Sequence, residues 1–396
     1  MLSRILWGHQ ASSNTQNSLE MESANGKTVL VSGASIAGLS TAYWLTQLGY
    51  HVTVVELASG PRLGGAAINI QGDALASAKQ MGIFEQLKTH RLPPPKFEFK
   101  TADDVTQNSL LAEADESPSD EAIEEVEIER DKLVTILLST LPNTVDFLFN
   151  NRVTGLRETA DAIHVTFKQG AARAFDLVFG CDGLHSGIRH LWFGPEADYA
   201  CFLEHYASLT IVNRLLLAQD TAQLYNTPGK GVLLNAYNGK TDIIFWFFSE
   251  NELPYDYRDA AQQREIVLQQ FAGLGWRTAE LLTEVKSAGI SYFDKFSQIK
   301  MPSWTKGRVA LVGDAGYCAS PAAGVGASLA MAGAAAVAEA LATHDGDFDA
   351  AFQAYNHTLR PFIEEVQATA VTMLNTFFVP KTEAAIRERN AQGMPF

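Results

Sequence analysis

The stretch VLVSGASIAG near the N-terminus places small residues at the end of an apolar run. Gly33, Ser35 and Gly38 follow the spacing G-x-S-x-x-G, close to the G-x-G-x-x-G at which a strand turns into a helix around a dinucleotide pyrophosphate. The two glycines allow the tight turn and the close packing of helix on strand. Ile36 and Ala37 begin the expected helix, whose free N–H groups and positive end attract phosphate. Ser35 keeps the middle position small and could add a hydroxyl donor.

An acidic residue follows at a spacing typical of ribose binding. Glu56 lies 23 residues after Gly33, at the end of the apolar run HVTVVE. A carboxylate in that place can bind both hydroxyls of an adenosine ribose and would repel a 2′-phosphate. The β-α-β unit alone leaves FAD, NAD and S-adenosylmethionine as alternatives, and an ordinary strand-to-helix turn can have the same glycine spacing.

A second glycine-rich turn favours FAD among these ligands. In ALVGDAGYCASPAAGVGASLA an apolar strand leads to Asp314, and Gly324 and Gly326 open an alanine-rich helix. Asp314 could bind a ribityl hydroxyl, while the positive start of the helix would face a ring that gains negative charge. A reduced flavin gains such charge, whereas a nicotinamide dinucleotide does not need it. A simple helix cap is the alternative role for Asp314.

The elements that position these residues form two interleaved parts. We predict an α/β fold in which a Rossmann-like FAD-binding domain is interleaved with a mixed β-sheet substrate domain and followed by a long C-terminal helix. Residues 1–25 are expected to be a disordered extension. The other expected boundaries are 26–95, 128–196 and 298–345 for the FAD-binding domain, 96–127 and 197–297 for the sheet domain, and 346–396 for the C-terminal helical segment.

The sequence makes more specific predictions for the sheet domain and for the last helix. In the sheet domain, aromatic strands such as TDIIFWFFS surround one helix near 259–273. Only two of the four residues in FWFF can face a substrate cavity, because side chains alternate along a strand, and packing in the core is an equal alternative. The last helix, 348–378, is expected to be broken or kinked at Pro361.

Composition limits the possible partners. The 396 residues are 46% hydrophobic and 19% charged, with a net charge of −15, and the segment EADESPSDEAIEEVEIE alone holds nine acidic residues. This balance excludes nucleic acid and anionic membranes as main ligands, since both require clustered Lys and Arg.

The apolar segment 328–342 contains Glu339 and is short for a membrane span, so we expect a buried helix. Three cysteines without a C-x-x-C pair indicate neither a disulfide framework nor a metal site, and they fit a reducing cytoplasm. The protein is expected to be a monomer.

The order of three motifs resembles that of the FAD-dependent aromatic monooxygenases with the p-hydroxybenzoate hydroxylase fold. These motifs are GASIAG with Glu56, then CDGLHSGIR, and then GRVALVGDAGYCASPAAGVG. The resemblance covers residues 27–378. It implies that Asp182 and Gly183, with Ser186 and Arg189, serve both FAD and a passing nicotinamide cofactor.

The resemblance also completes the set of expected cofactor-binding residues. It implies that Arg130 contacts the flavin nucleotide and that Asn69 lies near the flavin, where many relatives carry aspartate. Arg62 and Arg189 are the hypothetical nicotinamide contacts. The expected cofactor-binding residues are Gly33, Ser35, Ile36, Ala37, Gly38, Glu56, Arg62, Asn69, Arg130, Asp182, Gly183, Asp314, Pro321, Gly324, Gly326 and Ala327.

Within that family the chain looks most like the tetracycline-inactivating branch. The matching segments are TAYWLTQLGY, PRLGGAAINIQG, IKMPSWTKGRVALVGDAGYCASP and the long C-terminal helix. Tyr317, where many other hydroxylases have histidine, also favours this branch. The sequence departs from the family pattern at Ser35, Asn69, Gly316 and Val325, and relatives with similar motifs oxidise other polycyclic polyketides.

The resemblance implies an oxidoreductase that consumes NADPH or NADH and inserts one oxygen atom of O2 into an enolic or aromatic polycycle through a flavin C4a-hydroperoxide. Tetracycline inactivation is the favoured reaction. The alternatives are hydroxylation of another polyketide, an FAD-dependent dehydrogenase or reductase, and a flavin-carrying binding protein. No catalytic acid or base is assigned, because an enolic substrate supplies its own nucleophile. His185, His205 and Tyr317 are possible proton carriers for which a packing role is favoured.

Overall fold

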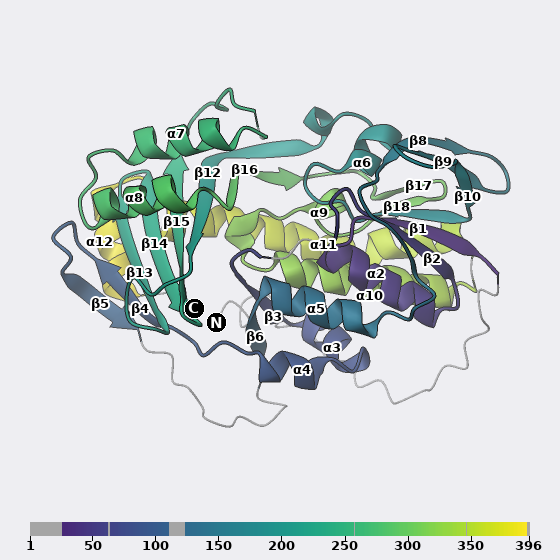
Figure 1. Cartoon of the computed structure of the whole chain (residues 1–396), viewed down its shortest axis with the longest axis horizontal. Helices are drawn as coiled ribbons and strands as arrows, with labels where there is room; N and C mark the ends of the chain where they lie inside the picture. The colour runs from purple at the N-terminus through teal and green to yellow at the C-terminus, as the bar shows by residue number, and fades with distance from the viewer. Residues whose placement is uncertain (1–25, 62–63, 111–122, 257, 346, 394–396) are drawn as a thin grey trace.

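The computed structural model describes residues 26–61, 64–110, 123–256, 258–345 and 347–393. The predictions for the extension 1–25, for Arg62 and for the acidic segment up to residue 122 lie outside the described residues. The chain folds as the expected α/β protein with a long C-terminal helix. Figure 1 shows a mostly parallel sheet with its helices beside a second, mainly antiparallel sheet, and helix α11 extends along both.

A six-stranded sheet carries the first part of the fold. Its strands run in the order β17-β18-β11-β1-β2-β7, and all neighbours are parallel except β17 and β18. The central strands β1 and β11 are mostly apolar and are buried on both faces except at Thr28, as expected of parallel strands covered by helices. The bounds are β1 Thr28–Ser32, β2 His51–Val55, β7 Asp146–Leu148, β11 Leu177–Gly180, β17 Thr305–Lys306 and β18 Val309–Leu311.

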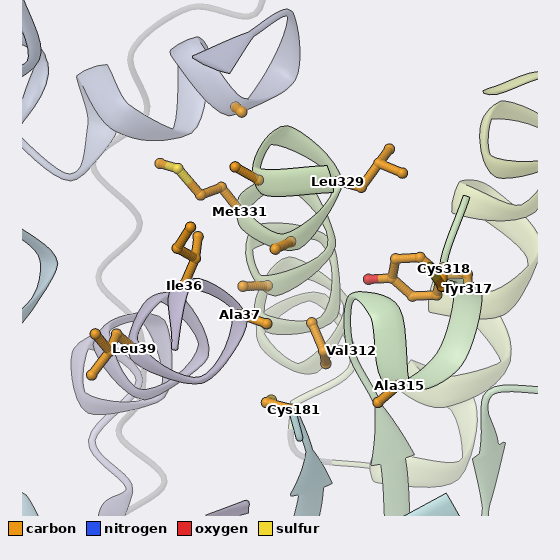
Figure 2. Close-up of a cluster of buried hydrophobic side chains, with 14 of the residues drawn as sticks. Ile36, Ala37, Leu39, Cys181, Val312, Ala315, Tyr317, Cys318, Leu329 and Met331 are labelled. Carbon is orange, nitrogen blue, oxygen red and sulfur yellow. The ribbon is translucent and has the colours of Figure 1, made fainter. Parts of the chain in front are cut away.

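Helices cover this sheet, and most residues of α10 are buried. Figure 2 shows Ile36 of α2 and Met331 of α10 pointing into the space between their two helices. Helix α10 is long and apolar enough to span a membrane by length and composition, yet 67% of it is buried inside the protein, which agrees with the expected core helix. The bounds are α2 Ile36–Gln47, α3 Asp73–Gln80, α4 Phe84–Thr89, α5 Arg130–Thr140, α6 Gly187–Trp192, α9 Asp314–Tyr317 and α10 Gly326–Thr343.

The second part is a seven-stranded sheet in the order β16-β12-β15-β14-β13-β4-β5. One face packs against α7 (Ala260–Phe271) and α8 (Thr278–Ala288), and α8 is an element that the sequence analysis did not predict. Phe245 and Phe247 of FWFF lie on that face, whereas Trp246 faces Phe378 near the C-terminus. The strands are β4 Lys96–Lys100, β5 Thr106–Leu110, β12 Ala200–Val212, β13 Thr221–Thr227, β14 Lys230–Tyr237, β15 Lys240–Phe248 and β16 Tyr292–Ile299.

Two smaller antiparallel sheets complete the strand pairing. Strands β8 (Val153–Glu158), β9 (Ile163–Phe167) and β10 (Arg173–Phe175) form a meander before β11. Strands β3 (Ala67–Gln71) and β6 (Glu125–Glu129) form a two-stranded ribbon, in which Ala67, Asn69 and Gln71 stand opposite the residues of β6. Figure 1 shows this ribbon in the middle of the molecule, between the seven-stranded sheet and the helices of the first part.

The C-terminal helix is not broken at Pro361, which corrects that part of the expectation. Helix α11 (Phe348–Met373) continues through Pro361 without a break, and a π-helical turn, η3 (Leu374–Phe378), follows it. Pro361 lacks the N–H group that would bond the carbonyl of His357, but the packing of α11 against α10 and η2 (Pro321–Ala323) holds the helix on both sides of that gap. After the turn, α12 (Glu383–Gln392) returns to the edge of the seven-stranded sheet.

A charged cluster joins the two parts near η1 (Glu196–Asp198). The ring of His185 bonds Glu196 through Nδ1 at 3.0 Å and Asp294 of β16 through Nε2 at 3.1 Å. These hydrogen bonds raise the pKa of His185 to about 9. His185 is therefore a cation in a structural bridge at neutral pH, and this favours the packing role over a role as proton carrier.

This bridge predicts a pH-dependent stability. Because the pKa of His185 is raised, its contribution is complete below the unfolded pKa of about 6.5 and disappears as the pH rises through about 9. After discounting for its exposed edge, we expect the wild type to lose about 1 kcal/mol more free energy of unfolding than His185→Gln between those values. Urea unfolding at several pH values measures this difference. His190→Gln, on the exposed side of α6, should match the wild type, and parallel curves for wild type and His185→Gln would contradict the bridge.

Candidate functional site

The turn between β1 and α2 is built on two close approaches of the backbone. Gly33 has φ +107°, and a Cβ there would lie 2.5 Å from the carbonyl oxygen of Cys181 at the end of β11. A Cβ on Gly38 would lie 1.8 Å from the carbonyl oxygen of Gly33. Both positions therefore require glycine, and they hold the start of α2, with Ile36 and Ala37 buried in its first turn, directly over the strand end.

Glu56 lies at the same edge of the sheet, just after β2. The N–H of Ala34 donates to its Oε2 and the N–H of Ala58 donates to its Oε1, each at 2.8 Å. These bonds fix the carboxylate beside the glycine turn, where it remains half-exposed. The geometry suits an acceptor for ribose hydroxyls.

The side chain of Ser35 accepts a hydrogen bond from an arginine that is distant in the sequence. The Arg130 Nη2 donates to Ser35 Oγ at 2.7 Å, and Nη1 donates to the carbonyl of Gly64 at 3.2 Å. Arg130 is the first residue of α5, so its guanidinium lies over the N-terminus of α2. A positive side chain and a helix start thus meet at one point, which is an arrangement that attracts phosphate.

The D-G motif is held by hydrogen bonds to the Asp182 carboxylate at the end of β11. Ser186 Oγ donates to Asp182 Oδ1 at 2.5 Å, and the N–H of Ile188 donates to Oδ2 at 3.0 Å. Burial raises the pKa of Asp182 despite these bonds. Gly183, at φ +81°, borders open space, because a Cβ there would meet no atom within 4 Å.

Arg189 does not occupy the place expected for a nicotinamide contact. Its side chain is fully buried, donates to the carbonyls of Ala315 and Leu184, and pairs with Glu196 at 2.9 Å. That expectation is wrong for this structure, since the guanidinium joins α6 to α9 inside the fold. Arg62 lies outside the described residues.

The second glycine turn faces the first across the strand ends. Asp314 begins α9 directly beyond β18, and it is accessible to solvent although burial on its other sides raises its pKa. Gly324 is left-handed at φ +68° and ends η2, while Gly326 begins α10 with no atom within 4 Å of a Cβ built there. Pro321 is exposed on the same turn, whereas Ala327 and Val325 are buried behind it.

Asn69 connects the β3–β6 ribbon to this turn. Ser328 Oγ, in the first turn of α10, donates to the carbonyl of Asn69 at 2.9 Å and accepts from the N–H of Gln71 at 3.1 Å. Asn69 Nδ2 donates to Glu125 at 3.0 Å, while its Oδ1 is buried without a partner. Gln71 was missed by the sequence analysis. Its side chain is fully buried with neither amide atom paired, and its period-two spacing from Asn69 on β3 was the only signal.

The residues present fit a long, flavin-like dinucleotide. The start of α2 with Glu56 and Arg130, and the start of α10 with Asp314, lie at the same carboxyl edge of the parallel sheet. Between them Gly183 and Gly326 border open space rather than packed side chains. The free N–H groups of these two helix starts are the donor set that such a ligand would use.

Two other candidates have structural partners instead. Tyr317 is fully buried with its hydroxyl 3.0 Å from that of Tyr355, and a Cβ on Gly333 would lie 1.8 Å from it. His205 is also buried, contacts the carbonyl of Leu203 at 2.6 Å, and has a pKa lowered by burial. Neither side chain is near enough to solvent to exchange protons freely, which favours packing roles.

Comparisons with known proteins agree with this geometry. Residues 27–370 match the FAD binding domain family. The chain is 36% identical over 367 residues to a flavin-dependent monooxygenase from an unknown prokaryotic organism, covering 92% of this chain and 94% of the relative. It is 39% identical over 344 residues to protein Rv1260 of Mycobacterium tuberculosis, covering 86% and 92%. The crystal structure of tetracycline destructase Tet(55) superposes with a TM-score of 0.81 at 34% identity, covering 93% and 95%.

These matches cover nearly the whole described fold and include both glycine turns. The chain belongs to the FAD binding domain family, and within it to the flavin-dependent monooxygenases.

Proposed function

We propose that this monooxygenase inserts one oxygen atom of O2 into a tetracycline-like polycycle, with FAD as cofactor and NADPH or NADH as electron donor. The single observation that carries the substrate class is the likeness of the whole chain to tetracycline destructase Tet(55). The proposed setting is the cytoplasm, whose reducing environment fits the three free cysteines, and the proposed oligomeric state is a monomer.

The seven-stranded sheet supports a substrate site on the face turned toward the β3–β6 ribbon. Leu233, Asn235 and Ile244 lie on this face in the two central strands, β14 and β15, and remain half-exposed. Side chains in the middle of a sheet are accessible only where the opposite layer leaves space. Trp246 and Phe378 close one end of this face with ring centroids 4.9 Å apart. The apolar side chains on this face would suit one side of a flat molecule.

The chain's own residues have four tasks in this proposal. Glu56, Arg130 and the start of α2 bind the nucleotide end of FAD, and Asp314 with the start of α10 holds the flavin end. The flavin, when bound, supplies the chemistry that activates O2. The face of the seven-stranded sheet that is turned toward the ribbon orients the polycycle, and its apolar residues Leu233, Ile244 and Trp246 exclude water. The hydrogen bonds of Asp182 to Ser186 and Ile188 keep the end of β11 rigid beside the cofactor.

Two alternatives from the sequence remain as competing proposals. Hydroxylation of another polyketide would use the same residues with a different polycycle. A dehydrogenase would consume NADPH in the presence of substrate without taking up oxygen, so an oxygen electrode separates it from a monooxygenase.

Gly326→Val tests the cofactor site. A valine there would project into the open space at the start of α10 and meet no protein atom within 4 Å at its Cβ, so the apoprotein should keep its stability. We expect the dissociation constant of FAD to rise about tenfold or more. Quenching of FAD fluorescence by the apoprotein measures it.

The matched control is Ala279→Val, in the exposed first turn of α8 behind the seven-stranded sheet. It should bind FAD as the wild type does. Unchanged FAD affinity in a folded Gly326→Val variant would show that the cofactor does not pass the start of α10.

The reaction itself is tested with tetracycline, NADPH and O2. We expect a product heavier by one oxygen atom in mass spectrometry, with one NADPH and one O2 consumed per product. The reaction without NADPH is the control. A yellow enzyme that leaves tetracycline unchanged while oxygenating another polycycle would replace the proposed substrate and keep the reaction type.

A further inference from the structure

The β3–β6 ribbon has one apolar and one polar face. Ile68, Ile70, Val126 and Ile128 pack into the core. The opposite face carries Asn69 and Gln71 from β3 and Glu125, Glu127 and Glu129 from β6, because the register pairs Ala67 with Glu129, Asn69 with Glu127 and Gln71 with Glu125.

The polar face of the ribbon is turned toward the seven-stranded sheet. Glu129 accepts hydrogen bonds from Asn238 and Lys240, each at 2.5 Å, at the turn between β14 and β15. Asp242 lies two residues beyond Lys240 on the same side of β15, and Glu127 lies two residues before Glu129 on the same side of β6. Both residues therefore lie on the facing sides of ribbon and sheet, close enough that the charge of Asp242 raises the pKa of Glu127.

Several polar atoms at this space are buried and unpaired. Asp242 is 1% exposed, and its Oδ2 accepts from Tyr237 at 2.7 Å while its Oδ1 has no partner. Both amide atoms of Gln71 and the Oδ1 of Asn69 also lack partners. Buried polar groups are rarely left unpaired unless a ligand or water completes them.

Carboxyl groups outnumber cations at this space, where the described residues include the cation Lys240. Burial, and then repulsion by Glu125 and Asp242, raises the pKa of Glu127 to about 7. Burial raises the pKa of Asp242 to about 6. Lys240 already pairs with Glu129 at the rim. A cation placed between Glu127 and Asp242 would relieve this repulsion.

A metal ion does not suit these side chains. Among the described residues, no three His, Cys, Asp or Glu side chains are arranged to hold a metal. The unpaired amides are spread along β3 toward the start of α10, where Ser328 bonds Asn69 and Gln71. A larger organic group that reaches the flavin end of the slot would touch all of them.

We propose that Glu127 and Asp242, with the unpaired amide oxygens of Asn69 and Gln71, form a subsite for a protonated amino group carried by the polycyclic substrate. This inference rests on the proposed function, since it takes the space between ribbon and sheet as part of the substrate cavity. The ammonium group would lie between the two carboxylates and would orient the polycycle relative to the flavin end.

The test compares ligand pairs that differ only in the amine. Calorimetric titration of the FAD-loaded enzyme without NADPH, at about pH 8, measures binding with both carboxyl groups ionised. One pair is tetracycline and 4-dedimethylaminotetracycline, and the other is 9-(aminomethyl)anthracene and 9-anthracenemethanol. We expect the wild type to prefer the amine in each pair by roughly tenfold, and Asp242→Asn or Glu127→Gln to remove this preference.

Glu280→Gln is the control, because it removes one negative charge from exposed α8 on the other face of the sheet. It should keep the preference. Equal binding of amine and neutral partner by the wild type, or an unchanged preference in folded Asp242→Asn, would overturn the subsite. An amine preference without oxygenation of tetracycline supports the subsite and contradicts the proposed substrate, whereas oxygenation without that preference overturns the subsite alone.

Discussion

The close approach of three backbone segments at Gly33 is the constraint on which the rest of the fold depends. The end of β11 lies so near Gly33 that any side chain would collide with the Cys181 carbonyl, and α2 starts so near β1 that Gly38 has no room for a Cβ. Those contacts fix where α2 begins and bring Glu56 and Asp182 to the same edge of the sheet. Residues separated by more than half the chain can share one ligand only because this edge is fixed.

Positive and negative groups are both concentrated at this edge of the sheet. Two helices start there, and their free N–H groups are partly positive. Burial raises the pKa values of the nearby acids Asp182 and Asp314. Keeping these two carboxyl groups ionised therefore lowers the stability of the protein when no ligand is bound. Arg130 adds a full positive charge over Ser35. An elongated ligand with phosphates at one end and hydroxyls along its length would satisfy both signs of charge.

The sequence was sufficient for the fold class and the enzyme family because both depend on local patterns. Glycine spacing, β-branched runs and the acid after a strand are visible in single segments such as GASIAG and VGDAG. The continuity of α11 through Pro361 could not be predicted from such a segment, since tertiary packing compensates for the hydrogen bond that proline removes. The burial of Arg189, the bond between Arg130 and Ser35, and the face shared by Glu127 and Asp242 arise from pairing of distant segments, which spacing along one chain does not reveal.

If packing were the only task of the β3–β6 ribbon, apolar residues on both of its faces would make the protein more stable. A buried polar group without a partner costs about 1–3 kcal/mol, and the ribbon and the facing strand leave such atoms on Asn69, Gln71 and Asp242. Apolar residues of similar size would have closed the gap, as Ile68 and Ile70 do on the opposite face of the same strand. The same strand thus packs tightly on one side and leaves polar groups unsatisfied on the other. That asymmetry is expected where a fold gives up stability to keep groups ready for a ligand.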